Sequence, residues 1–322
     1  MINKKKICVV GCGYWGKNHV KTLAKLGALG GVVEKNQDSV NNIKKLHPQV
    51  FCFNDLNDSF KANFDGYIVA TPVETHFKIA KCIIKKRFDL LIEKPLVFNM
   101  KEALEIKNLA NQFNVKILVG HVLLFHPAFQ KIKKIIDSGK LGKIQYLYSN
   151  RLNLGKIRTE ENVFWSFAPH DIALFQYLIG GFPDNITSRG SDIFNRGIHD
   201  TTITSFEYQN DIMAHLFVSW LHPFKEHRFI VIGENGMISF EDSSSSKPLI
   251  FYDKTVKWNQ SIPQTITGSN HLIEYNDELP LDLELKYFIN NLDKKTFDIS
   301  NCDLGVEVIK ILELATNSLK NR

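Results

Sequence analysis

Cysteines and long apolar runs are both scarce in this sequence. The 322 residues include five cysteines, and no two of them form a Cys-x-x-Cys pair. Such an odd, unpaired set argues against a disulfide framework and favours a reducing compartment, so we expect a cytoplasmic protein. The longest apolar runs, Ile117–Phe125 and Leu216–Leu221, are much shorter than the ~18 residues that a membrane-spanning helix needs. The early apolar stretch Ile7–Val10 stops at Gly11, so we expect neither a secretory signal nor membrane insertion.

Excess charge is also modest, at +6 overall, but it is unevenly distributed. Residues 1–150 carry 24 basic and 11 acidic residues, a balance of +13, whereas residues 151–322 carry 16 and 23, a balance of −7. A basic half is typical of proteins that bind nucleic acid or a small polyanion such as a dinucleotide. Its lysines recur at the spacing of a helix surface, as in Lys17, Lys21 and Lys25, with no zinc-ligand or RNA-binding pattern beside them. We therefore expect no nucleic-acid partner.

Residues 1–120 alternate short apolar runs with helical patterns. The candidate strands are Ile7–Val10, Gly31–Val33, Val50–Phe53, Gly66–Ala70, Leu90–Ile92 and Lys116–Val119. The candidate helices between them are Trp15–Leu26, Asp38–Leu46, Thr75–Lys86 and Met100–Phe113. This alternation predicts βαβ units and a parallel sheet, the arrangement of an α/β Rossmann domain.

Beyond residue 120 closely spaced strands dominate. The candidate strands are Ile144–Arg151, Thr201–Tyr208, Ile212–Trp220, Arg228–Ile232, Met237–Phe240 and Pro248–Tyr252, with helices expected at Ala128–Ser138, His170–Leu178 and Val306–Lys320. Short turns between strands predict a mostly antiparallel sheet, so residues 121–322 are expected to form a second, α+β domain for substrate and oligomerisation. Such a sheet buries an uncovered apolar face by self-association, which predicts a homodimer or homotetramer.

A glycine loop follows the first strand: Gly11-Cys12-Gly13-Tyr14-Trp15-Gly16. In a strand–loop–helix context the first glycine permits the tight turn, the second lets a pyrophosphate approach the backbone, and the third packs helix on strand. A plain strand-to-helix turn is the alternative. Glu34 lies 23 residues after Gly11, where a carboxylate binds the adenosine ribose hydroxyls and repels a 2′-phosphate. NAD is therefore favoured over NADP, although the neighbouring Lys35 partly offsets that repulsion.

Four further motifs occur in order along the chain. They are Thr71-Pro72-Val-Glu-Thr-His76, Glu93-Lys94-Pro95, Gly120-His121-Val-Leu-Leu-Phe-His126-Pro127 and Trp165-Ser166-Phe-Ala-Pro169-His170-Asp171. With the glycine loop, this set resembles the glucose–fructose oxidoreductase, inositol dehydrogenase and rhizopine-catabolism (Gfo/Idh/MocA) family of nicotinamide oxidoreductases. The match runs from Ile7 to Gly180, and the later strands fit by pattern only. The resemblance implies a cofactor site formed by Gly11, Gly13, Tyr14, Trp15, Gly16, Glu34, Thr71, Pro72, His76, Glu93 and Lys94.

Within that family, Trp15 of the glycine loop and the segment Ser149–Gly155 resemble members that act on nucleotide-activated sugars. The chain resembles the 3-dehydrogenases of UDP-N-acetylglucosamine and of its uronic acid. It implies NAD-dependent oxidation of C3 in a UDP-N-acetyl-hexosamine, whose 3-keto product an aminotransferase converts for lipopolysaccharide or other surface glycans. The alternatives are a ketoreductase, a dehydrogenase of a free sugar or inositol, and a non-catalytic NAD sensor.

Lys94 and His170 are the candidate catalytic residues. Lys94 follows the strand Leu90–Ile92 and so lies at the carboxyl edge of the sheet, where ligands of α/β folds bind. The resemblance implies that this lysine contacts the reacting hydroxyl and that the Lys94–Pro95 bond is cis. The imidazole of His170 is suited to proton transfer, so we expect it to be the base while Lys94 polarises the oxygen. The alternatives are a surface lysine and a helix-capping histidine.

Two positions depart from the family pattern. Ser166 stands where many relatives have an acid, and Leu124 stands where they have arginine. Anion contacts would then move to Arg151 or Arg158, which are weak candidates for the nucleotide phosphates. Other weak candidates for the substrate pocket are Tyr148, Trp165 and Asp171, with core packing as the alternative for the aromatic residues. His121 and His126 lack matching carboxylate or cysteine ligands, so we expect no metal site.

Overall fold

The computed structural model describes residues 5–155, 157–159, 161–194 and 197–320. Ten residues lie outside the described ones, at the two ends of the chain and within the second predicted domain: 1–4, 156, 160, 195–196 and 321–322. The chain divides into two compact units. The first comprises Met1–Phe125 and Glu278–Lys310, and the second comprises His126–Asp277 and Ile311–Arg322. The chain therefore crosses between the units more than once.

The first unit contains a six-stranded sheet whose pairs are all parallel, in the order β3-β2-β1-β4-β5-β6. Its strands are β1 (Ile7–Val10), β2 (Leu29–Val33), β3 (Phe51–Phe53), β4 (Gly66–Val69), β5 (Leu90–Glu93) and β6 (Ile117–Gly120). Four of them are buried along their whole length, which explains their unbroken apolar runs. The strand order reverses beside β1, and the crevice at such a reversal is where dinucleotides bind. The predicted Rossmann fold is confirmed.

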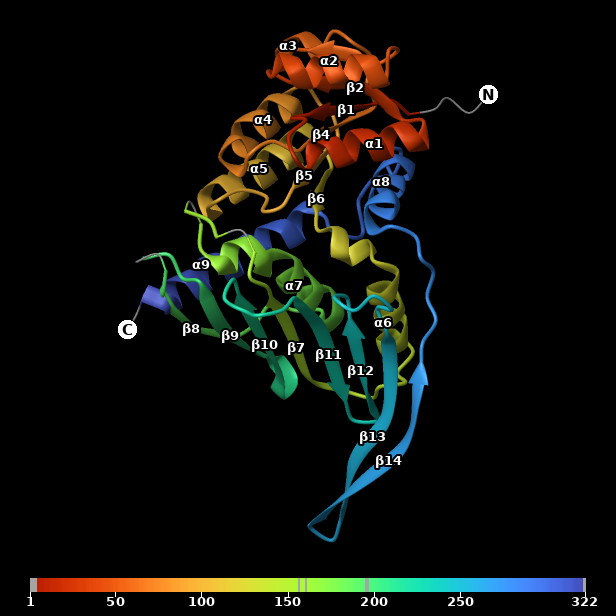
Figure 1. The fold of residues 1–322 in the computed structure, drawn as a ribbon, viewed down its shortest axis with the longest axis vertical. Helices are drawn as coiled ribbons and strands as arrows, with labels where there is room; N and C mark the ends of the chain where they lie inside the picture. The colour runs from red at the N-terminus through yellow and green to blue at the C-terminus, as the bar shows by residue number, and fades with distance from the viewer. Residues whose placement is uncertain (1–4, 156, 160, 195–196, 321–322) are drawn as a thin grey trace. The chain divides into compact units, whose positions relative to one another are not determined.

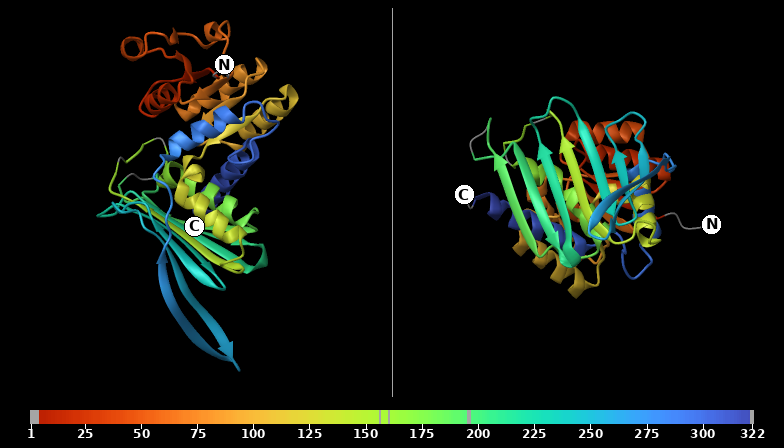
Figure 2. Two further views of the ribbon diagram at one scale, coloured as in Figure 1. Left: turned by 90° about the vertical axis from the view of Figure 1, so that its right-hand side faces the viewer. Right: turned by 90° about the horizontal axis from the view of Figure 1, so that it is seen from below.

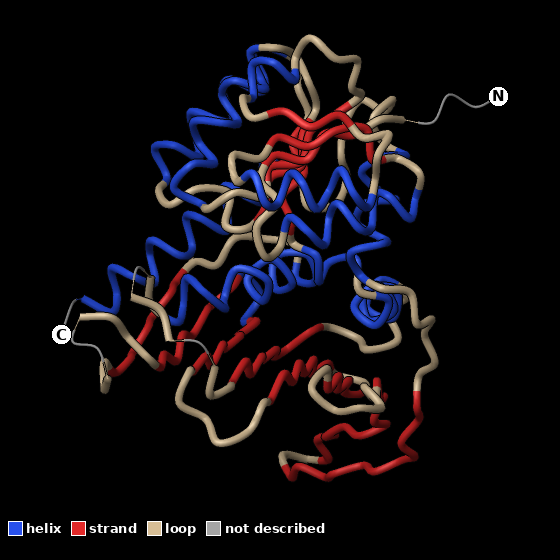
Figure 3. The backbone as a smooth tube through the Cα atoms, turned by 45° about the horizontal axis from the view of Figure 1, so that its top comes forward, coloured by secondary structure: helices blue, strands red, loops and turns tan. Residues whose placement is uncertain are grey.

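Helices lie on both faces of this sheet (Figures 1 and 3). They are α1 (Gly16–Leu26), α2 (Gln37–Leu46), α3 (Leu56–Ser59), α4 (Val73–Lys85), α5 (Met100–Phe113), the short 3-10 helix η1 (Val122–Phe125) and α8 (Pro280–Asn290). Helices α4 and α5 pack together, while α8 packs against α1 and η1. Side-chain caps fix several helix starts; Asn99, for example, accepts a hydrogen bond from the backbone N–H of Glu102 at the start of α5.

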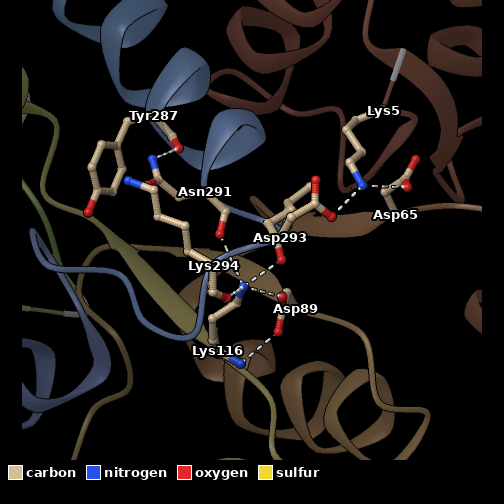
Figure 4. Close-up of polar contacts among 9 residues, drawn as sticks. Lys5, Asp65, Asp89, Lys116, Tyr287, Asn291, Asp293 and Lys294 are labelled. Carbon is tan, nitrogen blue, oxygen red and sulfur yellow. Dashed lines mark hydrogen bonds and ion pairs between the residues drawn. The ribbon is translucent and has the colours of Figure 1, made fainter. Parts of the chain in front are cut away.

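Residues 278–310 belong to the first unit, whereas the sequence analysis placed them in the second domain. Their attachment rests on Lys116, just before β6. Its Nζ donates to the carbonyl oxygens of Asn291, Leu292 and Lys294 at 3.1, 2.6 and 2.5 Å, and lies 3.0 Å from the Asp89 carboxylate (Figure 4). Apolar burial of α8 adds to this, because Leu285 and Phe288 are fully buried.

The second unit is built on an eight-stranded sheet in the order β14-β13-β12-β11-β7-β10-β9-β8. Its strands are β7 (Ile144–Leu152), β8 (Asn185–Ser191), β9 (Thr201–Tyr208), β10 (Ile212–Ser219), β11 (Glu226–Gly233), β12 (Gly236–Glu241), β13 (Leu249–Asn259) and β14 (Ile262–Leu272). The β7–β10 pair is parallel and the other pairs are antiparallel. The prediction of a mostly antiparallel second sheet is confirmed.

Helix α7 (Val163–Ile179) packs on one face of this sheet, against β7, β9 and β10. Residues facing it, such as Leu147 and Leu216, are buried. The opposite face is free of helices in Figure 2 and carries Ile203 and Met213, which are 52% and 45% exposed. The unit also contains α6 (Pro127–Asp137), the 3-10 turn η2 (Gln209–Asp211) and the last part of α9 (Cys302–Lys320).

The hairpin β13–β14 extends beyond its neighbours in the sheet (Figure 1). Every residue of β14 is exposed.

All five cysteines carry free thiols. Among the residues that the structure describes, no helix has the length and apolar character required to cross a membrane.

Candidate functional site

The glycine loop has the close backbone approaches that its three glycines predict. Gly11 has φ +89°, and a Cβ there would lie 2.6 Å from Cγ2 of Thr71. A Cβ on Gly16 would lie 2.0 Å from the carbonyl oxygen of Gly11, so helix and loop meet only because this residue is glycine. A Cβ on Gly13 would meet nothing within 4 Å. The loop therefore has open space at its second glycine, where a pyrophosphate approaches in dinucleotide sites.

The N-terminus of α1 has no competing anion of its own. Trp15 is its N-cap residue, no side chain caps the helix, and the first turn contains no acid. The first N–H groups of an 11-residue helix and its dipole thus remain available for a phosphate. Tyr14, beside them in the loop, is 91% exposed.

Glu34 lies at the end of β2 and contacts the glycine loop directly. Its Oε2 accepts a hydrogen bond from the backbone N–H of Cys12 at 2.6 Å, and its Oε1 accepts one from Asn36 N–H at 2.8 Å. Each carboxylate oxygen can accept a second hydrogen bond, as ribose recognition requires. Burial, with the charge of Glu34, raises the pKa of the Cys12 thiol to about 12, so this cysteine stays protonated. Together, the loop, the helix N-terminus and Glu34 fit an NAD molecule.

The Thr71–His76 segment is tied to the Lys94 turn through His76. The ring of His76 is buried, with Nε2 2.9 Å from the carbonyl oxygen of Thr71 and Nδ1 3.1 Å from that of Pro95. Burial lowers the pKa of His76 below its ordinary value. His76 therefore connects two loops at the carboxyl edge of the sheet, and Thr71 closes on Gly11 from the same edge. Pro72 precedes α4 as its N-cap residue.

Glu93 is the buried centre of this edge. Its Oε1 accepts hydrogen bonds from Trp15 Nε1 at 2.5 Å and lies 2.6 Å from His19 Nε2, while Oε2 accepts from Lys94 N–H at 3.2 Å. Burial alone raises the pKa of this carboxyl, but the hydrogen bond and charge of His19, the charge of Lys94 and the Trp15 hydrogen bond bring it below its ordinary value. His19 is a site residue that the sequence motifs did not predict. Its position, one helical turn after Trp15, is the signal that places both rings on one side of α1.

Lys94 is half-buried and begins the turn after β5, and its peptide bond to Pro95 is cis. His121, after β6, is 1% exposed. Burial, and after it the charge of Lys94, lowers the pKa of His121 to about 3, so this histidine is neutral near pH 7. His126 instead caps α6 in the second unit, where its Nδ1 accepts from Ala128 N–H. Within the described ranges no group of three or more His, Cys, Asp or Glu side chains is arranged to hold a metal ion.

In the second unit, α7 carries Trp165, Ser166, His170 and Asp171. The helix begins at Val163, earlier than predicted, because the Asn162 side chain accepts from Trp165 N–H and Pro169 is tolerated within the helix. His170 is therefore an interior helix residue, and the helix-capping alternative is wrong. It is half-buried.

Asp171 joins α7 to β7. Its buried carboxylate accepts from Arg151 Nε at 2.6 Å and Nη2 at 3.1 Å, and from Ser149 Oγ at 2.7 Å. Burial lowers the pKa of Arg151, but the charge and hydrogen bonds of Asp171 outweigh it and raise that pKa overall. Arg151 is therefore held by an acid of its own chain.

The remaining second-unit candidates each contact a group other than this pair. The Tyr148 ring stacks on His215 at a centroid distance of 5.0 Å, on the opposite face of β7 from Ser149. Trp165 Nε1 donates to Thr316 Oγ1 at 2.9 Å. Arg158 is exposed and lies 3.6 Å from the Glu161 carboxylate.

Two family models match the chain. The oxidoreductase family model with an NAD-binding Rossmann fold, GFO/IDH/MocA, matches residues 5–121, and the GFO/IDH/MocA C-terminal domain matches residues 129–239. Each model matches part of one unit, and the first match includes the glycine loop, Glu34 and Lys94. The first unit is thus an NAD-binding Rossmann domain.

Individual relatives are more distant. The UDP-N-acetylglucosamine 3-dehydrogenase of Acidithiobacillus ferrooxidans is 27% identical over 184 residues, 56% of this chain and 56% of that protein, so the match spans little more than half of that relative. The scyllo-inositol 2-dehydrogenase (NAD(+)) of Bacillus subtilis is 24% identical over 255 residues, 74% of each chain.

Solved structures share the whole fold. The A. ferrooxidans enzyme superposes with a TM-score of 0.86 at 20% identity, covering 98% of this chain and 97% of that one. The WlbA dehydrogenase from Bordetella pertussis, solved with NADH and UDP-GlcNAcA, gives a TM-score of 0.80 at 18% identity over 99% and 97%.

Proposed function

Because the chain belongs to the GFO/IDH/MocA family of oxidoreductases, we propose that it uses NAD to oxidise a ring hydroxyl, at C3, of a UDP-N-acetyl-hexosamine-type sugar nucleotide. The observation that carries the proposal is the Glu93–Lys94 turn. Lys94 follows the carboxyl end of β5. Glu93, the residue before it, contacts both Trp15 of the glycine loop and the backbone N–H of Lys94. Glu93 therefore connects a candidate catalytic lysine to the proposed cofactor loop. The choice of sugar rests on the two UDP-sugar relatives.

The mechanism assigns one task to each residue. The glycine loop and the N-terminus of α1 hold the pyrophosphate, and Glu34 accepts from the ribose hydroxyls. NAD, when bound, accepts the hydride. Lys94 donates a hydrogen bond to the substrate oxygen and polarises the O–H bond, and His170 takes the hydroxyl proton at Nε2. The C–H electron pair thus leaves with the hydride, the proton passes to His170, and a ketone remains.

Reduced-nicotinamide absorbance tests the substrate. The protein is mixed with NAD and a panel of UDP- and dTDP-sugars, with a ketone trap to pull the equilibrium. We expect reduction with UDP-N-acetylglucosamine or its uronic acid, and product analysis then fixes the carbon. If NAD binds but no sugar of the panel is oxidised, the sugar-nucleotide assignment is wrong.

The assignment of the base is tested by pH–rate profiles of Lys94→Met and His170→Asn. We expect His170→Asn to remove the acidic limb of the kcat profile, since the imidazole must be neutral to accept the proton. Near-normal turnover of His170→Asn with an unchanged profile would refute its role.

Oxidation of a free polyol is a second candidate, favoured by the scyllo-inositol relative, whose match covers more of both chains than that of the UDP-sugar enzyme. Competition separates the two. UDP should inhibit a sugar-nucleotide dehydrogenase because it occupies the nucleotide subsite, and it should leave inositol oxidation unchanged. A protein that binds NAD and turns over neither class would be an NAD sensor.

We further propose that the helix-free face of the second sheet forms a homodimer or homotetramer, since it exposes apolar side chains such as Ile203 and Met213. Sedimentation at micromolar concentration tests this, and a monomer would contradict it.

A 3-keto sugar nucleotide is also the substrate that a cytoplasmic aminotransferase needs to make a 3-amino sugar for surface glycans such as lipopolysaccharide.

A further inference from the structure

We infer that Glu93 is a positioning residue that fixes the cofactor loop and the Lys94 turn to each other through Trp15 and His19. The inference deepens the proposed function and rests on it only in giving Lys94 a role in catalysis. Its basis is the convergence of groups from two separate segments on one buried carboxylate.

Trp15 and His19 meet the same oxygen of Glu93 from one side. Trp15 belongs to the loop after β1, whereas Glu93 ends β5, with β4 between those two strands. The indole therefore reaches across the end of β4 to make its hydrogen bond. Its ring also packs edge-on against His19, at 6.4 Å between centroids and 87° between planes. Because hydrogen bonds to a carboxylate in a water-poor site are strong, this contact limits the motion of the loop.

The other oxygen of Glu93 faces the Lys94 turn. It accepts the backbone N–H of Lys94, and a Cβ on Gly120 would lie 2.9 Å from it. Gly120 thus provides the space that the carboxylate fills. A shift of the carboxylate toward Trp15 and His19 would weaken its contact with the Lys94 N–H, and a shift toward Lys94 would weaken the contacts with Trp15 and His19. The position of the glycine loop and the start of the Lys94 turn are therefore coupled.

The low solvent exposure of Glu93 and His19 distinguishes a positioning role from direct contact with the cofactor. His19 is fully buried and Glu93 is 8% exposed, whereas Trp15 is 38% exposed. Both oxygens of Glu93 contact groups of the protein itself. NAD affinity should therefore depend on Glu93 indirectly, through the glycine loop to which Trp15 belongs. Without the indole N–H the loop would be less ordered before binding. Ordering the loop would then cost conformational entropy when NAD binds, and the affinity would fall.

A double-mutant cycle on NADH affinity tests the coupling. Trp15→Phe keeps the ring and removes the N–H, and Glu93→Gln removes the charge. We expect each to raise the dissociation constant for NADH about tenfold, and the double variant to be within about twofold of the weaker single variant. Multiplication of the two effects, or unchanged binding by Trp15→Phe, would overturn the inference. Trp258→Phe is the matched control, since Trp258 is 71% exposed in β13, and it should bind NADH as the unchanged protein does.

A pair of variants at His19 gives a second test if Glu93→Gln does not fold. His19→Gln keeps an N–H donor, whereas His19→Leu removes it. We expect His19→Gln to bind NADH within about threefold of the unchanged protein and His19→Leu to bind about tenfold more weakly. Equal affinities for these two variants would also overturn the inference, because a role in packing alone does not distinguish them.

Steady-state kinetics separates positioning from stability. At saturating NAD, Trp15→Phe should regain most of its kcat, while Glu93→Gln should stay slow because it also loses the negative charge that acts on Lys94. Equal kcat values at saturation would contradict this. The binding tests use NADH alone, so failure to oxidise any sugar nucleotide would refute the proposed substrate and leave their outcome intact.

Discussion

The two ends of strands β5 and β6 have opposite chemistry. At the carboxyl end, the buried acid Glu93 gathers N–H donors from Trp15, His19 and Lys94. At the amino end, the ammonium group of the half-buried Lys116 donates to the carbonyl oxygens of Asn291, Leu292 and Lys294, beside the Asp89 carboxylate (Figure 4). The first set contacts the glycine loop, where we propose that NAD binds. The second attaches a distant chain segment. The proposal thus assigns function to one end of the sheet and stability to the other, and each end can be changed separately.

The largest effect is expected at the carboxyl end. Lys94→Met should lower kcat about a thousandfold, because the substrate oxygen loses its charged donor. Stopped-flow or steady-state reduction of NAD measures it. The control is Lys107→Met, which removes a surface ion pair with Asp303 and should leave kcat unchanged. Turnover of Lys94→Met within tenfold of the unchanged protein would refute a catalytic role.

At the amino end, Lys116→Met should lower the free energy of unfolding by about 3 kcal/mol, because Asp89 and the three carbonyl oxygens lose a shared cationic donor. Urea unfolding followed by circular dichroism measures it. NADH affinity of the folded variant should be unchanged. Lys107→Met again serves as the control, with an expected loss below about 1 kcal/mol for its exposed pair. A similar loss in both variants would break the comparison.

A smaller effect, confined to function, is expected from Gly13→Ala. The added methyl group meets no protein atom within 4 Å, so stability should hold. It would occupy the space that a pyrophosphate needs, and the dissociation constant for NADH should rise about tenfold. Gly181→Ala is the matched control, since its Cβ also meets nothing within 4 Å and it lies in the second unit. Calorimetric titration with NADH that shows equal affinity for both variants would contradict the loop assignment.

The smallest effect concerns Glu284 on α8. This carboxyl is fully buried, and in the part of the chain that the structure describes neither of its oxygens has a hydrogen-bond partner. Burial, and then the charge of Glu93, raises its pKa well above the ordinary value. Helix α8 packs against α1, and the Lys25–Asp282 ion pair joins these two helices.

The sign of the pH dependence follows from that raised pKa. The folded protein holds the Glu284 proton more tightly than the unfolded chain, so this group reduces stability as pH rises above the ordinary value near 4.5. Glu284→Gln does not titrate, so it should melt about 2–4 °C higher than the unchanged protein at pH 7. That difference should shrink as the pH falls toward 4.5. Scanning calorimetry at both pH values measures it, and a constant difference would show that Glu284 is not the titrating group.

Elements with one clear periodicity could be predicted from the sequence. The strands and main helices of the Rossmann sheet lie within a few residues of their predicted ranges, since each is an unbroken apolar run or a regular helical pattern. Helix α8 was missed because Leu281, Leu283 and Leu285 alternate with acids and imitate a strand. Strand β14 was missed because every residue in it is exposed, which leaves no apolar alternation to read.

The candidate site was predictable where a motif fixes the backbone. The glycines, Glu34 and Lys94 lie where strand–loop–helix logic puts them. His19 was not predicted, because the motif ends at the third glycine and the partner, Glu93, is 74 residues away. The pairing of Arg151 with Asp171 was equally hidden, since it depends on which face of β7 meets α7.

The division of the chain also bears on the order of its synthesis. The glycine loop and Lys116 are synthesised before the segment after α8 that Lys116 binds, and Leu292 in that segment follows Lys116 by 176 residues in the same unit. A nascent chain that ends at Phe125 would therefore present β6 and Lys116 without these partners. The first unit is complete only after residues 278–310 have been made, and during that interval the exposed edge is where a chaperone would bind.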